Sequence, residues 1–188
     1  MKKYLLLINI FCFGCDSPNS EKEEKFHPLI GDFLFQDLDS SPLCDAIELV
    51  TPGYKNANLS HIGIVVELGD PNCINPNYIF ENDIQILEAI PKNVKITRLD
   101  SFLNRSFDRN NNPKVIVGRL KPKYRHTIDN AISFLISKLG AKYDDAFLLN
   151  NNEYYCSELI YEAFKKDKIF QVRPMTFLHP ANKDTLET

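Results

Sequence analysis

The strand-forming segments of this chain precede its long helical segments, and this order constrains the fold more than any other feature. Runs of β-branched and aromatic residues bounded by Gly, Pro, Asn and Asp are typical of strands. Such runs occupy residues 30–37, 60–68, 78–90, 94–99 and 114–120. We expect the third run to be a hairpin that turns at Asn82 and Asp83. Together these runs predict one antiparallel sheet of five or six strands.

Helical patterns are concentrated in the last third of the chain. Residues 127–140 combine a Thr127 cap, apolar residues at helical spacing and Gly140 as a stop signal. Further helices are expected at about 156–166 and, as shorter turns, at 45–50 and 100–105. Strands followed by helices favour an α+β fold with the helices packed on one side of the sheet.

The N-terminal segment has the layout of an export signal. Two lysines precede an apolar run from Tyr4 to Phe13, which is shorter than the roughly 20 residues of a membrane-spanning helix. The run ends in "CFGC", which resembles a bacterial lipoprotein signal whose last cysteine becomes the lipidated N-terminus. We therefore expect a signal peptide at 1–14 and lipidation of Cys15, with an ordinary secretory leader as the alternative.

The residues after this signal predict a tether and one folded domain. The segment "DSPNSEKEEK" is polar and lacks apolar periodicity, so residues 15–25 are expected to form a flexible tether and residues 26–188 the domain. A net charge of -3 argues against a nucleic-acid partner. The expected location is the bacterial cell envelope, where the N-terminal lipid would anchor the protein to a membrane.

Four cysteines remain after removal of the signal: Cys15, Cys44, Cys73 and Cys156. An exported domain is in an oxidising compartment. Two outcomes stay open for Cys44 and Cys73, which either form a disulfide or remain buried free thiols. Cys156 is the thiol without an expected partner.

The stretch "EYYCSELIYEAF" places Cys156 at the start of a helix. Unpaired backbone N–H groups and the helix dipole favour a thiolate there, and the same amides can bind an oxyanion. The alternative is a small apolar residue at the start of a buried helix face.

A nucleophilic cysteine needs a base, and imidazole is suited to that role. The chain has four histidines, His27, His61, His126 and His179. We interpret the other three as surface residues, whereas His61 opens the apolar strand "SHIGIVVEL". Gly63 beside it is typical of a close approach by another group. The alternative is a structural histidine at a strand end; no paired His or Cys spacing predicts a metal.

The segments "GDFLFQD", "SHIGIVV", "LEAIPKNV" and "KYDDAFLLNNNEYYCSELIY" resemble, in content and order, the permuted papain-like amidases. These form the YiiX-like branch of the NlpC-type cysteine hydrolases, and the resemblance spans roughly residues 29–165. It implies a circularly permuted papain-like fold, in which the histidine strand precedes the cysteine helix. It also implies that Cys156 is the nucleophile, His61 the base and Glu88 the third member, which orients the ring. A solvent-facing strand glutamate is the alternative for Glu88.

Three other polar residues are given structural interpretations. Asp32 follows Gly31 and is expected to form a turn before a strand. Glu158 falls in a first helical turn, where a carboxylate complements the dipole. Tyr143 is expected to be a packed aromatic residue.

The residues and the resemblance together predict an exported cysteine hydrolase that cleaves an amide or related acyl bond through a thioester. The expected substrate is a small peptide or acylated molecule, with cell-wall peptides as the first candidate. Neither a metal nor an organic cofactor is implied, and the oligomeric state stays open. The alternatives are an acyltransferase of the same fold and a non-catalytic lipoprotein that binds peptides or amino acids.

Overall fold

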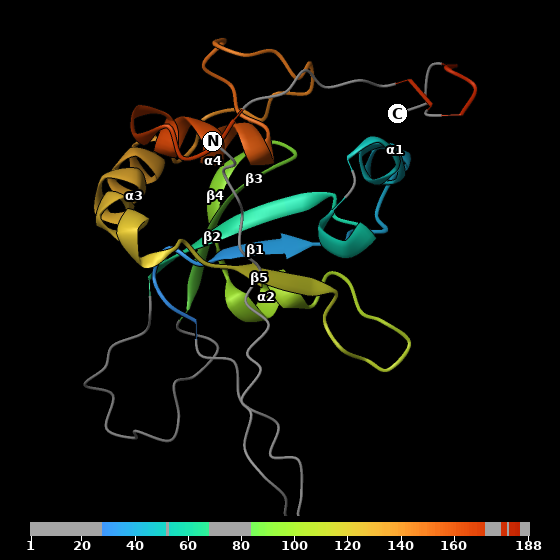
Figure 1. The fold of residues 1–188 in the computed structure, drawn as a ribbon, viewed down its shortest axis with the longest axis horizontal. Helices are drawn as coiled ribbons and strands as arrows, with labels where there is room; N and C mark the ends of the chain where they lie inside the picture. The colour runs from blue at the N-terminus through green and yellow to red at the C-terminus, as the bar shows by residue number, and fades with distance from the viewer. Residues whose placement is uncertain (1–27, 52, 68–83, 172–177, 180, 185–188) are drawn as a thin grey trace, which may run out of the picture.

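Five antiparallel strands form one sheet (Figure 1). The structure is a computed structural model that describes residues 28–51, 53–67, 84–171, 178–179 and 181–184. The strand order is β4-β3-β2-β1-β5. The strands are β1 (Phe33–Gln36), β2 (His61–Glu67), β3 (Gln85–Ile90), β4 (Asn93–Arg98) and β5 (Val115–Gly118). The prediction of an α+β fold with an antiparallel sheet is thus confirmed.

The structure describes only one arm of the hairpin expected at 78–90. The turn at Asn82 and Asp83, with the first arm of the 78–90 segment, lies outside the described residues. The second arm is β3, which pairs along its whole length with β4 from Gln85–Arg98 to Ile90–Asn93. The chain reverses between these strands at Lys92, whose φ of 101° lies in the left-handed region.

Four α-helices and three short 3₁₀ helices accompany the sheet in the described part of the chain. The α-helices are α1 (Pro42–Val50), α2 (Leu99–Leu103), α3 (Ile128–Ser137) and α4 (Cys156–Phe164). The 3₁₀ helices are η1 (Tyr54–Asn56), η3 (Pro122–Thr127) and η4 (Lys165–Asp167). Within the described ranges, no helix has both the length and the apolar character needed to cross a membrane.

Thr127 does not cap α3 with its side chain, which corrects the sequence interpretation. The 3₁₀ helix η3 runs directly into α3, so Thr127 already has helical dihedrals, φ -87° and ψ -12°. Its hydroxyl instead donates to the carbonyl of Tyr124. At the other end α3 stops at Ser137, and Gly140 follows with φ +82°, as a glycine stop signal predicts.

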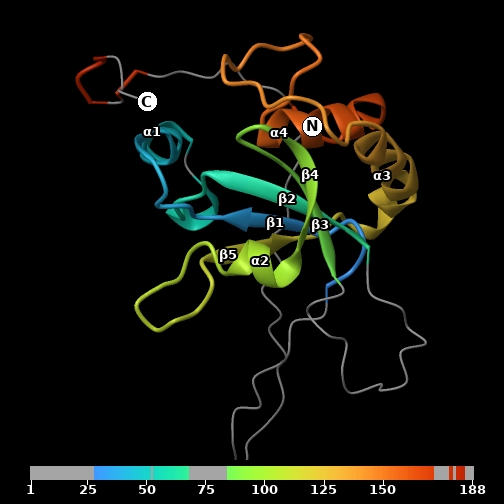
Figure 2. The same ribbon diagram turned by 180° about the vertical axis from the view of Figure 1, so that it is seen from behind.

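The sheet has an apolar core on each face. Phe33 and Ile64 belong to the core shared with α3 and α4, whereas their neighbours Leu34 and Val65 belong to the core shared with α2. This alternation is the normal period of a strand. The expectation that all helices lie on one side is therefore wrong, because α2 lies on the face of the sheet opposite α3 and α4 (Figure 2). Its Phe102 is fully buried there. Burying such a side chain contributes about 1.5–3 kcal/mol.

The ladder between β2 and β3 does not reach the start of β2. Its last paired residues are Gly63 and Glu88, so His61 and Ile62 have no partner on β3. On its other side His61 is still paired with Gln36 of β1. The two central strands thus part at the end of the sheet where β2 begins, and this is where the chemistry-bearing side chains gather.

Candidate active site

His61 and Glu88 are placed on one face of the sheet by strand alternation. His61 and Gly63 are two residues apart on β2, and Glu88 is paired with Gly63 across the ladder. Both side chains are buried, with 8% of His61 and 1% of Glu88 exposed. The His61 Nε2 atom lies 2.7 Å from the Glu88 Oε2 atom.

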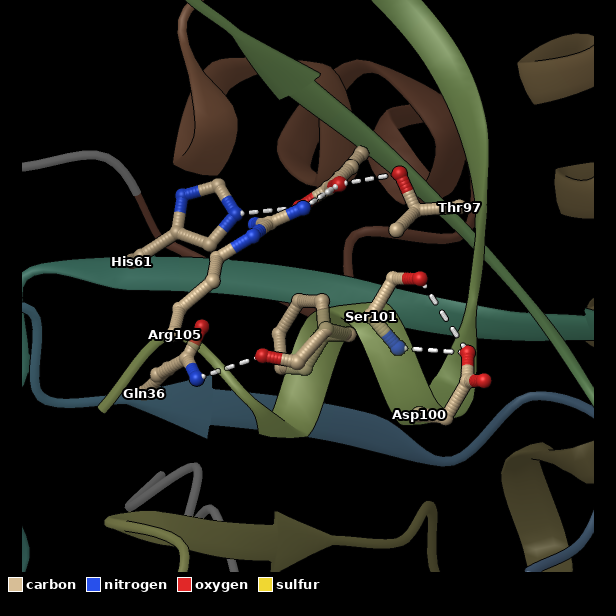
Figure 3. A network of polar contacts seen from close by, with 8 residues as sticks. Gln36, His61, Thr97, Asp100, Ser101 and Arg105 are labelled. Carbon is tan, nitrogen blue, oxygen red and sulfur yellow. Dashed lines mark hydrogen bonds and ion pairs between the residues drawn. The ribbon is translucent and has the colours of Figure 1, made fainter. Parts of the chain in front are cut away.

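The Glu88 carboxylate also accepts hydrogen bonds from two other side chains. Arg105 donates from Nη1 to Oε2 at 2.7 Å and from Nη2 to Oε1 at 2.5 Å, and the Thr97 hydroxyl donates to Oε1 at 2.5 Å. In Figure 3 the labelled side chains of His61, Thr97 and Arg105 converge on one point, where dashed lines mark the hydrogen bonds to the unlabelled Glu88 carboxylate. Burial would raise the pKa of Glu88, but the bonds from Arg105 and His61 outweigh it and lower the pKa to about 2. Glu88 is therefore an anion at neutral pH.

An anionic Glu88 determines the tautomer of His61. A carboxylate can only accept, so the imidazole must carry a proton on Nε2, and Nδ1 is left for another partner. The Cys156 side chain hydrogen-bonds with His61, and we assign this bond to Nδ1 because Glu88 occupies Nε2. Burial would lower the pKa of His61, but the interactions with Cys156 and Glu88 outweigh it and raise the pKa to about 9.

Cys156 is the first residue of α4, after Tyr155 as the N-cap. The first backbone N–H groups of a helix have no partner within it, so they are free to bind a negative charge at this thiol. The helix packs on the face of the sheet opposite α2, yet Cys156 reaches His61 where β2 and β3 part. The structure thus brings together Cys156, His61 and Glu88.

The Phe102 ring of α2 packs against the His61 ring. The two ring centroids are 5.8 Å apart, and the guanidinium of Arg105 lies 5.2 Å from the Phe102 centroid. A Cβ atom at Gly63 would lie 3.0 Å from the Phe102 ring and 2.6 Å from Ile86. Gly63 therefore permits α2 to pack close beneath the histidine, which is the close approach that a glycine in a strand predicts.

Asp32 has a structural role, as its sequence context predicts. Its carboxylate accepts the Leu29 N–H in a turn and pairs with Arg119 at 2.6 Å through both oxygens. The Asp32 carbonyl accepts the N–H of Val65, four residues along β2 from His61. At about 3.3 Å per residue this separation is about 13 Å, so Asp32 does not belong to the site.

Glu158 lies in the first turn of α4, as expected, but it is only 2% exposed, so interaction of a charged carboxylate with the helix dipole does not describe it fully. Its burial, and then the nearby Asp144, raise its pKa to about 7, although backbone N–H groups of Tyr155 and Asn150 bond to it. One of its oxygens has no hydrogen-bond partner among the described residues. Tyr143 packs against the core, and burial followed by the proximity of Cys156 raises its pKa.

The remaining cysteines and histidines lie apart from this site or outside the described residues. Cys44 is a free, buried thiol that contacts the hydroxyls of Ser40 and Ser41 at 3.4 Å. His126 in η3 is exposed, and His179 is half-buried. Outside the described residues are Cys15, Cys73 and His27. In the described part of the chain, no cluster of three or more His, Cys, Asp or Glu could hold a metal ion.

Sequence reasoning missed Thr97 and Arg105. Thr97 could have been found, because β4 pairs with β3 and alternation places Thr97 on the face of Glu88. Arg105 carries no such signal, since it follows α2 and its direction depends on how that helix packs. Arg105 could therefore be found only from the tertiary structure.

A cysteine at a helix N-terminus lies beside a histidine and a carboxylate on an antiparallel sheet that precedes that helix, which is the arrangement that the resemblance to permuted papain-like amidases implies. Residues 28–186 match the family described as permuted papain-like amidase enzyme, YaeF/YiiX, C92 family. The chain belongs to this family. The family resemblance predicted from the sequence is thereby confirmed, and membership supports an amidase or peptidase enzyme.

A solved structure agrees on the fold. The chain is similar to the crystal structure of metalloprotein yiiX from Escherichia coli O157:H7, with a TM-score of 0.54 and 23% sequence identity. The similarity covers 75% of this chain and 67% of that one. Among curated proteins, none matches this chain.

Proposed function

We propose that this protein is a cysteine hydrolase that cleaves an amide or related acyl bond, with Cys156 as nucleophile, His61 as base and Glu88 as the orienting carboxylate. The observation that carries the proposal is the position of the His61 ring, which hydrogen-bonds with Glu88 through Nε2 and with the Cys156 thiol. Membership of an amidase family supports the same reaction class.

In the acylation step the Cys156 thiolate attacks the substrate carbonyl and forms a C–S bond. The N–H groups of the first turn of α4 stabilise the resulting oxyanion. The protonated His61 then gives its Nδ1 proton to the leaving amine as the C–N bond breaks, and a thioester remains.

In the second step a water molecule gives a proton to His61 and attacks the thioester. The C–S bond breaks, the carboxylic acid leaves, and the thiolate and imidazolium are restored. An acceptor other than water would make the same site an acyltransferase.

The proposed setting is the cell envelope, with a lipid on Cys15 and a small peptide or acylated substrate. The support for this setting is the order of lysines, apolar run and "GC" at the N-terminus, followed by a polar tether. Cell-wall peptides are the first substrates to test because an envelope anchor would bring the site close to them.

The test measures iodoacetamide alkylation of Cys156 against pH. We expect Cys156 to be alkylated readily at neutral pH, because a helix N-terminus and an adjacent imidazole favour the reactive thiolate. His61→Ala should slow alkylation at neutral pH, and Glu88→Gln should slow it less. The matched control is His126→Ala, which removes an exposed histidine and should change nothing.

A second measurement distinguishes catalysis from binding. Incubation with p-nitrophenyl acetate should add one acetyl group to Cys156 by intact mass, and the adduct should disappear with time. An adduct that persists in water and leaves when an amine is added would favour an acyltransferase. If Cys156 is alkylated only at alkaline pH and His61→Ala has no effect, the site is a non-catalytic one.

A further inference from the structure

The Glu88 carboxylate has every acceptor position occupied. An ionised carboxylate offers about four lone-pair positions on two oxygens. Oε2 accepts from His61 and Arg105, and Oε1 accepts from Thr97 and Arg105. Of these donors only Arg105 bonds to both oxygens, so it fixes the plane in which Oε2 faces the imidazole.

We propose that Arg105 is a positioning residue of this site, which keeps Glu88 ionised and aligned with His61 whichever charge the imidazole carries. This inference rests on the proposed function and deepens it. Arg105 acts through Glu88 and is not itself a catalytic residue.

The need for a second positive charge follows from the proposed cycle. His61 is positive before it protonates the leaving amine and neutral afterwards, whereas Glu88 stays buried throughout. A buried carboxylate without a partner is strongly disfavoured, and it would be left so each time His61 becomes neutral. Because a guanidinium is always protonated, Arg105 supplies a counter-charge that does not change during the cycle.

The charge of Glu88 in turn keeps the correct nitrogen of His61 basic. A neutral carboxylic acid would donate its proton to Nε2, and the ring proton of a neutral imidazole would then sit on Nδ1. Nδ1 could no longer accept a proton from water. By keeping Glu88 ionised, Arg105 leaves Nδ1 free on the side of Cys156.

The surroundings of Arg105 fit this role. Its side chain is 24% exposed, its guanidinium lies over the Phe102 ring at 5.2 Å, and Phe102 itself is fully buried. The packing of α2 on the sheet therefore determines where the guanidinium lies. This gives α2, which contributes no member of the proposed triad, a function in the site.

The test compares Arg105→Gln, which removes the charge, with Arg105→Lys, which keeps the charge but not the two-point contact. The His61 pKa is followed by NMR of its imidazole C–H signal, identified by its loss in His61→Ala. Arg105→Gln should raise this pKa by about 1 unit, because a like charge near the imidazolium is removed. It should also slow release of the acetyl group from Cys156 by roughly tenfold, a typical effect of losing an outer partner.

Arg105→Lys should leave the His61 pKa near its wild-type value and slow acetyl release less than Arg105→Gln. The matched control is Arg98→Gln, which removes the same charge from an exposed pair with Asp100 and should change neither measurement. Circular dichroism checks that each variant is folded. If Arg105→Gln does not fold, Arg105→Met replaces it as the uncharged variant of similar length, and an unchanged rate of acetyl release in that variant would overturn the inference.

Failure of this inference differs from failure of the proposed function. If wild-type Cys156 is never acetylated and its alkylation is independent of His61, the hydrolase proposal fails. Suppose instead that Cys156 is acetylated and its alkylation depends on His61, but Arg105→Gln changes neither the His61 pKa nor acetyl release. In that case only the positioning role of Arg105 is wrong.

Discussion

At the scale of single residues, the pKa of a buried carboxylate in and near the site depends on which charged groups surround it. Glu88 and Glu158 are both almost completely buried, yet the pKa of Glu88 is lowered to about 2 and that of Glu158 is raised to about 7. The difference lies in their partners, because Glu88 pairs with Arg105 and His61 whereas Glu158 lies near Asp144. The two carboxylates therefore affect stability with opposite signs.

Glu88 should make the protein sensitive to acid. Its pKa falls from 4.5 in the unfolded chain to about 2 in the fold, so its contribution is complete above pH 4.5 and is lost as the pH falls through 2. A shift of this size corresponds to about 3 kcal/mol. Urea unfolding between pH 5 and pH 2 should show the loss, and Glu88→Gln should flatten the slope. Asp129→Asn, at an exposed position in α3, serves as the control.

Glu158 should do the opposite. Its folded pKa of about 7 lies above its ordinary 4.5, so the fold favours the protonated form and loses stability as the pH rises from 4.5 through 7. Glu158→Gln removes that charge while keeping an acceptor for the backbone N–H groups. We expect its melting temperature to exceed that of wild type at pH 8 by more than at pH 5. An equal difference at both pH values would contradict this assignment.

At the scale of elements, the site depends on how closely α2 can approach β2. The approach is possible because Gly63 leaves room for the Phe102 ring and for Ile86. Glu88 is paired with this glycine across the ladder and contacts His61 on the same face of the sheet. Gly63 thus lets α2 pack against the face that carries the two proposed catalytic side chains.

Gly63→Ala should therefore destabilise the protein by about 1–3 kcal/mol, because the new methyl group overlaps Ile86 and Phe102. Phe102→Leu combined with Gly63→Ala should restore part of that loss, since the smaller side chain removes one overlap. Chemical denaturation of the two single variants and the double variant gives the interaction free energy between positions 63 and 102. Strict additivity of the single effects would show that the two positions do not interact.

At the scale of the whole molecule, the sequence predicted the sheet, the long helices and the family, because strand alternation, turn residues and helix spacing are local signals. It also named His61, Glu88 and Cys156, since family motifs preserve their order in the chain. It did not predict α2 on the second face or the role of Arg105, because both depend on the packing of Phe102. It was wrong about the Thr127 cap, since η3 continues into α3 without a break.

The lipid anchor is a prediction for the whole protein. If Cys15 becomes the lipidated N-terminus, Cys15→Ser should move the protein from the membrane fraction to the soluble fraction of cells. The proposed hydrolase site should be unaffected, because Cys15 precedes the domain. Equal membrane association of the variant and the native protein would show that the N-terminal signal is not a lipoprotein signal.

The parting of β2 and β3 at Gly63 and Glu88 has a consequence for when the protein becomes reactive. Cys156 follows His61 by 95 positions in the chain. The two side chains meet only after α4 has packed against the end of the sheet where β2 and β3 are not paired. Until then the thiol has neither a helix terminus nor an imidazole to activate it, and it is as inert as any ordinary cysteine. Under the proposed function, the newly made chain is therefore latent, and folding itself brings the proposed nucleophile to its base.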